Sequence, residues 1–118
     1  MKHEEHIDLK DRTQKFALRV IELTKTLNNN LAEREIAKQL IRSGMSVGAN
    51  TRAAFRGRSK KEFIAKVGIV IEEADECSYW LELLKRLINI NKEEIDSLNK
   101  EAQELTSIFV SISKRNKK

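Results

Sequence analysis

Carboxylates gather in one segment of the chain and raise the question of a metal site. The acidic residues of this segment are Glu72, Glu73, Asp75, Glu76 and Glu82. Inward-facing carboxylates hold metal ions in some helical bundles, but those sites also need Glu-x-x-His from two helices. The two histidines, His3 and His6, both lie near the N-terminus. The sequence therefore predicts no metal site and no cofactor, and it favours an acidic face that meets a basic face of a neighbouring subunit.

Two large aromatic residues, Tyr79 and Trp80, follow the acidic run. Neighbouring positions on a helix point to different sides, so at most one of them joins a central apolar stripe. An outward aromatic residue usually marks a contact surface, and the alternative is a place in the core. We expect a subunit interface formed by Glu72, Glu73, Glu76, Tyr79 and Trp80. An alternative for Glu76 is that it reaches inward to an arginine or to Asn50.

Positive charge gathers in two groups, and the formal net charge of the chain is +5. Arg34, Lys38 and Arg42 recur every four residues, which places them on one edge of a helix. The denser group consists of Arg52, Arg56, Arg58, Lys60, Lys61 and Lys66. Such a surface contacts the phosphates of RNA or DNA in a salt-dependent way, without reading the sequence. The alternative is a solvated helix face whose charges pair with nearby glutamates.

No arrangement of nucleophile, acid and base indicates an enzyme. The single cysteine, Cys77, has no partner for a disulfide and no nearby base that would activate its thiol. A phosphate-binding loop would need its glycines at a strand-to-helix turn, with Lys and Ser or Thr directly after them. The sequence lacks that pattern, so we expect a protein that is not an enzyme.

Three glycines interrupt the basic region, and two of them have helical spacing. Gly44 and Gly48 lie four residues apart on one side of a predicted helix, where each costs about 1 kcal/mol relative to alanine. Close packing of a second helix against this small-residue surface is the explanation we expect. Asn50 is polar within the same segment, and we expect its amide to bond to a neighbouring helix or loop because an unsatisfied buried amide is costly.

The elements that carry these residues are all predicted to be helices. Proline is absent, aromatic residues make up 5% of the 118-residue chain, and apolar residues recur every three or four positions. Ser59 with Glu62, and Asn91 with Glu94, have the spacing of a helix start. The prediction is a single domain with an all-α fold, an antiparallel up-down-up-down four-helix bundle with helices at 8–28, 31–55, 60–89 and 92–114.

No apolar run approaches the roughly 18 residues that cross a membrane, and the first residues do not resemble a signal peptide. With a single cysteine in the chain, a reducing compartment fits best. We therefore expect a cytoplasmic protein without a membrane partner.

Three motifs within residues 40–84 resemble those of one bacterial family. They are S-x-G-A-N at 46–50, S-K-x-[ED]-F at 59–63 and E-x-x-Y-W-L-E-L-L at 76–84. The family was first noticed as proteins encoded in intervening sequences of 23S rRNA genes, and the resemblance extends over nearly the whole chain. One departure is Thr51 with Ala53 and Ala54, where many members carry Ile followed by Glu-Ala or Glu-Gly. The missing acid makes this segment more basic and weakly favours an anionic partner.

The resemblance implies a four-helix bundle that associates as a homopentamer. A related protein is the accessory variability protein of diversity-generating retroelements, which works with a reverse transcriptase and nucleic acid. By this resemblance the partners are copies of the chain itself, RNA or DNA, and a reverse transcriptase or another protein. The function we expect is that of a nucleic-acid-associated accessory factor, and the alternative is a protein assembly module that binds no nucleic acid.

Overall fold

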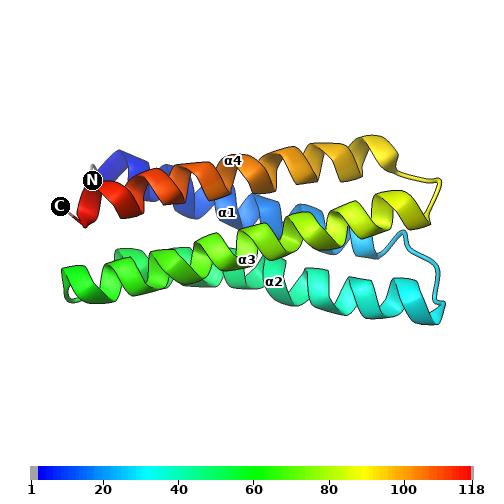
Figure 1. Cartoon of the computed structure of the whole chain (residues 1–118), viewed down its shortest axis with the longest axis horizontal. Helices are drawn as coiled ribbons and strands as arrows, with labels where there is room; N and C mark the ends of the chain where they lie inside the picture. The colour runs from blue at the N-terminus through cyan, green and yellow to red at the C-terminus, as the bar shows by residue number, and fades with distance from the viewer. Residues whose placement is uncertain (1–2, 118) are drawn as a thin grey trace.

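Four antiparallel α-helices make up residues 3–117, which are the residues that the computed structural model describes (Figure 1). The helices are α1 (His3–Thr24), α2 (Leu31–Phe55), α3 (Lys60–Leu87) and α4 (Lys92–Asn116). Each helix packs against the next one in the chain, and α4 also packs against α1, which closes the bundle. These residues contain no β-strand, so the predicted all-α four-helix bundle is confirmed.

The core forms where the apolar stripes of the four helices meet. Six apolar residues of α4 that recur every three or four positions are all buried: Ile95, Leu98, Ala102, Leu105, Phe109 and Ile112. In α1 the buried stripe also contains Thr13, which an apolar pattern does not reveal. The Thr13 hydroxyl donates to the carbonyl oxygen of Leu9 at 2.7 Å, so its burial leaves no polar atom unsatisfied. Burial of these stripes supplies the main driving force for the fold.

The boundaries of α1 differ from the predicted 8–28, because the helix begins at His3 and ends at Thr24. At the C-terminal end the amides of Thr26 and Leu27 donate to carbonyls three residues back, at 3.0 and 3.2 Å. This tighter turn ends the α-helix while Leu27 still packs against the core. The apolar spacing therefore continues past the point at which the helix stops.

Two of the helix starts differ from what the cap signatures predict. Ser59 caps α3 as predicted, since its side chain accepts from the Glu62 amide at 3.0 Å. Asn91 directly precedes α4 as predicted, but the cap bond that the signature implies is absent: its φ is 57°, and its side-chain amide donates to the Thr26 hydroxyl at 2.7 Å. Asn30 is a cap that sequence reasoning missed, and it accepts from the Glu33 amide at 2.9 Å.

The last two helices end close to their predicted residues. The predicted end of α3 was residue 89, but Ile88 is extended, with φ −118° and ψ 160°, so the helix stops at Leu87. The predicted end of α4 was residue 114, and the helix continues to Asn116, whose side-chain amide donates to the Ile112 carbonyl at 2.8 Å. Both differences are within the usual uncertainty of helix boundaries.

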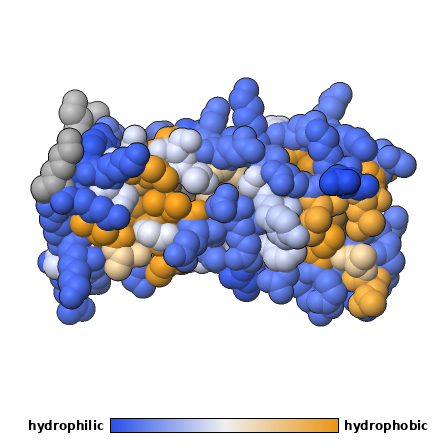
Figure 2. Space-filling view, viewed as in Figure 1, coloured by the Kyte–Doolittle hydropathy of each residue, from blue (hydrophilic) through white to orange (hydrophobic). Residues whose placement is uncertain are grey.

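The bundle measures 45 × 22 × 20 Å, and different segments of the chain lie at its two ends. The start of α1, the α2–α3 turn and the end of α4 lie at one end, and the other two turns lie at the opposite end (Figure 1). In the same view, hydrophobic surface appears near both ends with a polar band between them (Figure 2). Within the described residues, no helix combines the length and the apolar character that spanning a membrane requires.

Candidate functional site

The turn between α2 and α3 is a tight structure that presents basic side chains. The amides of Arg56 and Gly57 close it by donating to Ala53 and Ala54 carbonyls at 3.2 and 3.0 Å. A Cβ on Gly57 would lie 3.0 Å from the Ala54 carbonyl oxygen, so any other residue would have to displace this backbone by a few tenths of an ångström. With the Ser59 cap on its other side, the turn holds its neighbours in a fixed geometry.

Aromatic rings from three helices pack behind this turn. The His6 ring of α1 stacks on Phe55 of α2, with ring centroids 4.0 Å apart and planes 10° apart. Phe55 in turn contacts Phe63 of α3 at 5.9 Å. Sequence reasoning left His6 without a role because it took the helix to start five residues later. The rings tie α1 to the α2–α3 turn and stiffen this end of the bundle.

We call the residues around this turn the α2–α3 basic surface: Arg52, Arg56, Arg58, Lys60, Lys61 and Lys66. All are exposed except Lys66, which is half-buried. Among the side chains described, those of residues 5–117, no carboxylate pairs with Arg52, Arg56, Arg58, Lys61 or Lys66. Other arginines of the chain behave differently, since Arg12 bonds Glu101 at 2.6 Å and Arg19 bonds Glu94 at 2.7 Å. The protein therefore neutralises some of its arginines internally and leaves Arg52, Arg56 and Arg58 available to an external anion.

The other predicted basic group does not form part of the same surface. Arg42 donates to Glu73 at 2.8 Å and also to Glu76, so it joins α2 to α3. Lys38 lies 3.5 Å from Glu35, and Arg34 contacts the side-chain oxygen of Asn29 at 3.5 Å. The hydrogen bond from Arg42 to Glu76 is the largest cause of a raised Arg42 pKa, which shows that this guanidinium is committed to its carboxylates.

The predicted interface residues on α3 divide between inward and outward positions. Glu73 and Glu76 bind Arg42, and the Trp80 indole donates to Glu76 at 3.1 Å. Partial burial alone would raise the pKa of Glu76, but hydrogen bonds from Trp80 and Arg42 outweigh it, so the pKa is lowered. Of the two alternatives for an inward Glu76, the structure shows the arginine.

Glu72 and Tyr79 point outward from the same helix. Tyr79 is 53% exposed and contacts Trp80 edge to face, with ring centroids 5.1 Å apart. Trp80 packs partly against the core. The exposed face of α3 also carries Asp75 and Glu82, and in the described part of the chain none of Glu72, Asp75 and Glu82 has a basic partner. The result is an uncompensated acidic face beside an exposed aromatic ring.

The side chains of Asn50 and Cys77 both have hydrogen-bond partners within the chain. The Asn50 amide donates to the backbone oxygen of Ser46 at 3.0 Å and to its hydroxyl at 2.8 Å. The expected bond to a neighbouring helix or loop is therefore wrong, because a residue one turn earlier in α2 supplies both acceptors. Cys77 is fully buried, its thiol lies 3.2 Å from the Ser43 hydroxyl, and burial raises its pKa to about 12.

The two glycines of α2 both face α1, at different distances. A Cβ on Gly44 would lie 3.1 Å from a Val20 methyl carbon, whereas a Cβ on Gly48 would lie 3.5 Å from the Thr13 carbonyl oxygen. Gly44 therefore sits in direct helix contact, and Gly48 has room for a methyl group.

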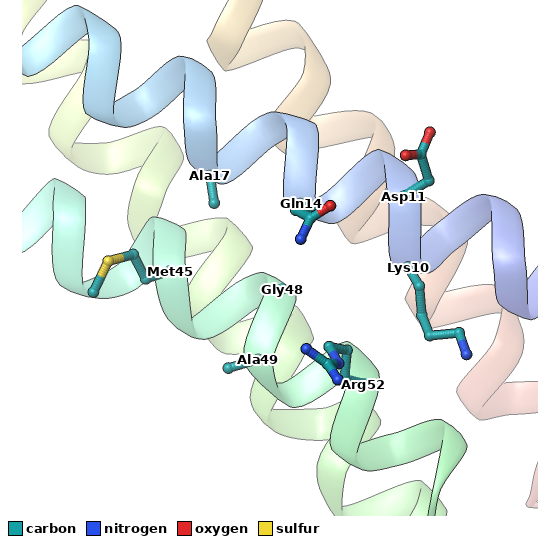
Figure 3. Close-up of a pocket in the computed structure, with 8 residues that line it drawn as sticks. All are labelled: Lys10, Asp11, Gln14, Ala17, Met45, Gly48, Ala49 and Arg52. Carbon is teal, nitrogen blue, oxygen red and sulfur yellow. The ribbon is translucent and has the colours of Figure 1, made fainter.

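Beside Gly48, α1 and α2 separate to form a groove of about 480 Å³ (Figure 3). We call it the α1–α2 groove; its lining residues are Lys10, Asp11, Gln14, Ala17, Met45, Gly48, Ala49 and Arg52. Sequence reasoning missed it because the two walls come from different helices, and neither wall alone has an unusual pattern. Arg52 belongs both to this groove and to the α2–α3 basic surface.

Metal ligands do not come together in the described residues. Among the described side chains, those of residues 5–117, no group of three or more histidines, cysteines or carboxylates could hold a metal ion. The acidic residues of α3 are instead divided between ion pairs with Arg42 and the outward acidic face.

Comparison with known proteins places this geometry in a family context. Residues 5–111 match the family model described as 23S rRNA-intervening sequence protein. The chain is also similar to a crystal structure of a protein of unknown function from the S23 ribosomal protein family of Bacteroides thetaiotaomicron. The two share 42% sequence identity, the match covers 90% of this chain and 98% of that one, and the TM-score is 0.82. No curated protein matches the chain.

Proposed function

The chain belongs to the family of 23S rRNA-intervening sequence proteins, and from that premise we propose that it is a non-enzymatic, oligomeric accessory protein that binds nucleic acid through the α2–α3 basic surface. The observation that supports the proposal is the contrast among its arginines. Arg12, Arg19 and Arg42 are bound to glutamates of the same chain. Arg52, Arg56 and Arg58 have no such partner in the described chain.

Unpaired cations on a stiff turn are suited to phosphate contacts. Their charge is not offset by internal carboxylates, so an external phosphate gains the full electrostatic attraction and releases condensed counterions. The Gly57 turn and the aromatic rings behind it hold in place the backbone that carries these side chains. This lowers the conformational entropy lost on binding. Contacts of this kind recognise the backbone and carry no base preference of their own.

The pattern of shifted pKa values supports a non-enzymatic role. Catalytic groups usually gather in a cleft with pKa values moved toward neutrality. In the described residues, the shifted values belong to ion-paired groups such as Arg12 and Glu76 and to the buried thiol of Cys77. Each shift has a structural cause, and none brings a group toward neutral pH.

Assembly of several subunits would strengthen weak phosphate contacts. One subunit carries an acidic face on α3 and a basic surface at the α2–α3 turn, and two unlike surfaces are what a head-to-tail ring requires. The resemblance to related proteins implies five subunits in that ring. A ring presents several copies of the basic surface to one strand, so that binding gains from avidity. A reverse transcriptase or another protein is the further partner that the resemblance implies.

The test compares two variants that each remove two positive charges. The first is Arg56→Ser with Arg58→Ser, and the matched control is Arg86→Ser with Lys100→Ser, which removes exposed cations away from the turn. We expect the first variant to bind single-stranded RNA more weakly. Its slope of log affinity against log salt should be shallower by about 1.4, the value for two lost phosphate contacts. Equal effects of the two variants would contradict the proposal.

A second candidate function is a protein assembly module without nucleic acid. It is favoured by the unpaired acids Glu72, Asp75 and Glu82, since the basic surface of one subunit could bind the acidic face of the next. Under this function the Arg56→Ser, Arg58→Ser variant would dissociate into smaller species in light scattering. Wild-type protein would not retard RNA or DNA at low salt.

A further inference from the structure

The α1–α2 groove combines small or apolar residues with one side-chain amide and two cations. Its floor consists of small or apolar residues from both helices, Ala17, Gly48 and Ala49, with the thioether of Met45 at one side. Met45 is 49% exposed although it is apolar. The volume of the groove, about 480 Å³, falls within the range of about 300–1,000 Å³ that is usual for small-molecule sites.

The polar groups of the groove lie on different sides of this floor. The Gln14 side chain points from α1 toward α2, and Arg52 extends back along α2 toward Gly48 (Figure 3). Lys10 lies on α1 at the end of the groove nearer the α2–α3 turn. The Gln14 amide has both donors and an acceptor, which the edge of a nucleobase can use.

The charge of the groove is positive once its ion pairs are taken into account. Asp11, the acid of the groove, is paired with Lys15 at 2.9 Å. Lys10 and Arg52 form no ion pair with any carboxylate of residues 5–117, whose side chains the structure describes. An anion bound beside Lys10 and Arg52 would therefore meet two cations without a carboxylate partner. The one carboxylate of the groove, Asp11, is already paired with Lys15.

We propose that the α1–α2 groove binds one nucleotide unit, with its base over the Gly48 and Ala49 floor and its phosphate beside Lys10 and Arg52. Guanidinium planes and apolar side chains stack on unpaired bases, and phosphates bind cations next to them. The inference rests on the proposed function, because Arg52 belongs to both surfaces and a strand on the α2–α3 basic surface would reach the groove. It adds a preference for single strands, since a base inside a duplex cannot enter.

Filling the groove tests this assignment without disturbing the core. Ala49 is exposed, so Ala49→Phe places a ring over the floor. Ala32→Phe adds the same ring at an exposed site in the first turn of α2, away from the α2–α3 turn, and is the control. We expect Ala49→Phe to weaken binding of a single-stranded RNA oligonucleotide about tenfold, the size of one lost stacking contact. Binding of an RNA duplex of equal length should not change, and Ala32→Phe should bind both as wild type does. Thermal melting of both variants checks that they fold.

Two results would overturn the groove site while leaving the proposed function in place. One is that Ala49→Phe binds the single strand with the same affinity as the wild type. The other is an equal loss for single strand and duplex, which would mean that the ring acts on phosphate contacts alone.

Adenosine 5′-monophosphate distinguishes a free nucleotide from a nucleotide within a strand. Saturable binding of the mononucleotide that Ala49→Phe abolishes, with no binding of any oligonucleotide, would support the groove site and contradict the proposed function. Wild-type protein that binds neither the mononucleotide nor the oligonucleotide would contradict both.

Discussion

At the scale of single residues, the two glycines of α2 have different physical roles although they have the same spacing. Gly44 contacts the Val20 side chain, which is fully buried, so a larger side chain there has no space. Gly48 faces the Thr13 backbone at an ordinary contact distance and borders the α1–α2 groove. The sequence predicts that a small-residue surface faces a helix, but which glycine is in tight contact depends on the helix opposite.

Substitutions at the two glycines should therefore change stability in opposite directions. Gly48→Ala fits the available space and removes the flexibility of a helical glycine, so we expect the free energy of unfolding to rise by up to about 1 kcal/mol. Gly44→Leu overpacks the contact with Val20 and should lower it by about 1–3 kcal/mol. Urea unfolding measures both. A change in the same direction at the two positions would contradict the assignment.

The thiol of Cys77 should make stability depend on alkaline pH. Burial raises its pKa from an ordinary 9.0 to about 12 in the folded protein. Above pH 9 the unfolded chain releases this proton and the folded protein keeps it, so the folded state loses stability as the pH rises toward 12. Relative to Cys77→Ala, the wild type should lose about 1.4 kcal/mol of unfolding free energy per pH unit in that range. Parallel stability curves for the two proteins between pH 9 and pH 10 would refute the raised pKa.

At the scale of elements, the apolar periodicity predicts the helices well, because burial follows directly from it. The stripe of α4 and the Ser59 cap of α3 are confirmed. The pattern of Asn91 followed by Glu94 marks a turn correctly, but it does not determine the backbone conformation within that turn. Asn91 adopts the left-handed region and reaches Thr26 on another turn, a contact between distant residues that no local pattern contains.

Two substitutions of Asn91 should separate the contribution of the backbone conformation to stability from that of the side-chain hydrogen bond. Asn91→Ala removes the bond to Thr26 and places an alanine at φ 57°, so we expect a loss of about 1–2 kcal/mol in unfolding free energy. Asn91→Gly removes the same bond but accepts that φ, and should be less destabilising. Thermal melts of the two variants give the comparison. An equal loss would show that the side-chain bond, and not the backbone, determines the cost.

At the scale of the whole molecule, the sequence predicts where charge gathers but not which charges are neutralised. Arg42 looks like the other basic residues in the sequence, and only the packing of α2 on α3 brings Glu73 and Glu76 to it. The α1–α2 groove likewise depends on the spacing of two helices. Pairing across helices is a property of the fold. It separates Arg42, which is bound to glutamates, from the residues of the α2–α3 basic surface.

Assembly is predicted to depend on the outward face of α3. The monomer mass is 13.6 kDa, and light scattering of the wild type at micromolar concentration should give a multiple of it. Glu72→Lys reverses a charge on the acidic face and should shift the protein toward the monomer. Glu93→Lys reverses an exposed acid of α4 and serves as the control. A wild-type mass equal to the monomer, or equal effects of the two substitutions, would rule out assembly through this face.

The measurement that most directly tests the central claim is the position of nucleic acid on the protein. A photoreactive single-stranded RNA, cross-linked to the wild type and mapped by mass spectrometry of the peptides, reports that position. We predict that the cross-links concentrate in residues 10–17 and 45–66, which cover both walls of the groove, the Gly57 turn and the start of α3. Cross-links concentrated in α4, or spread evenly over the bundle, would contradict the account.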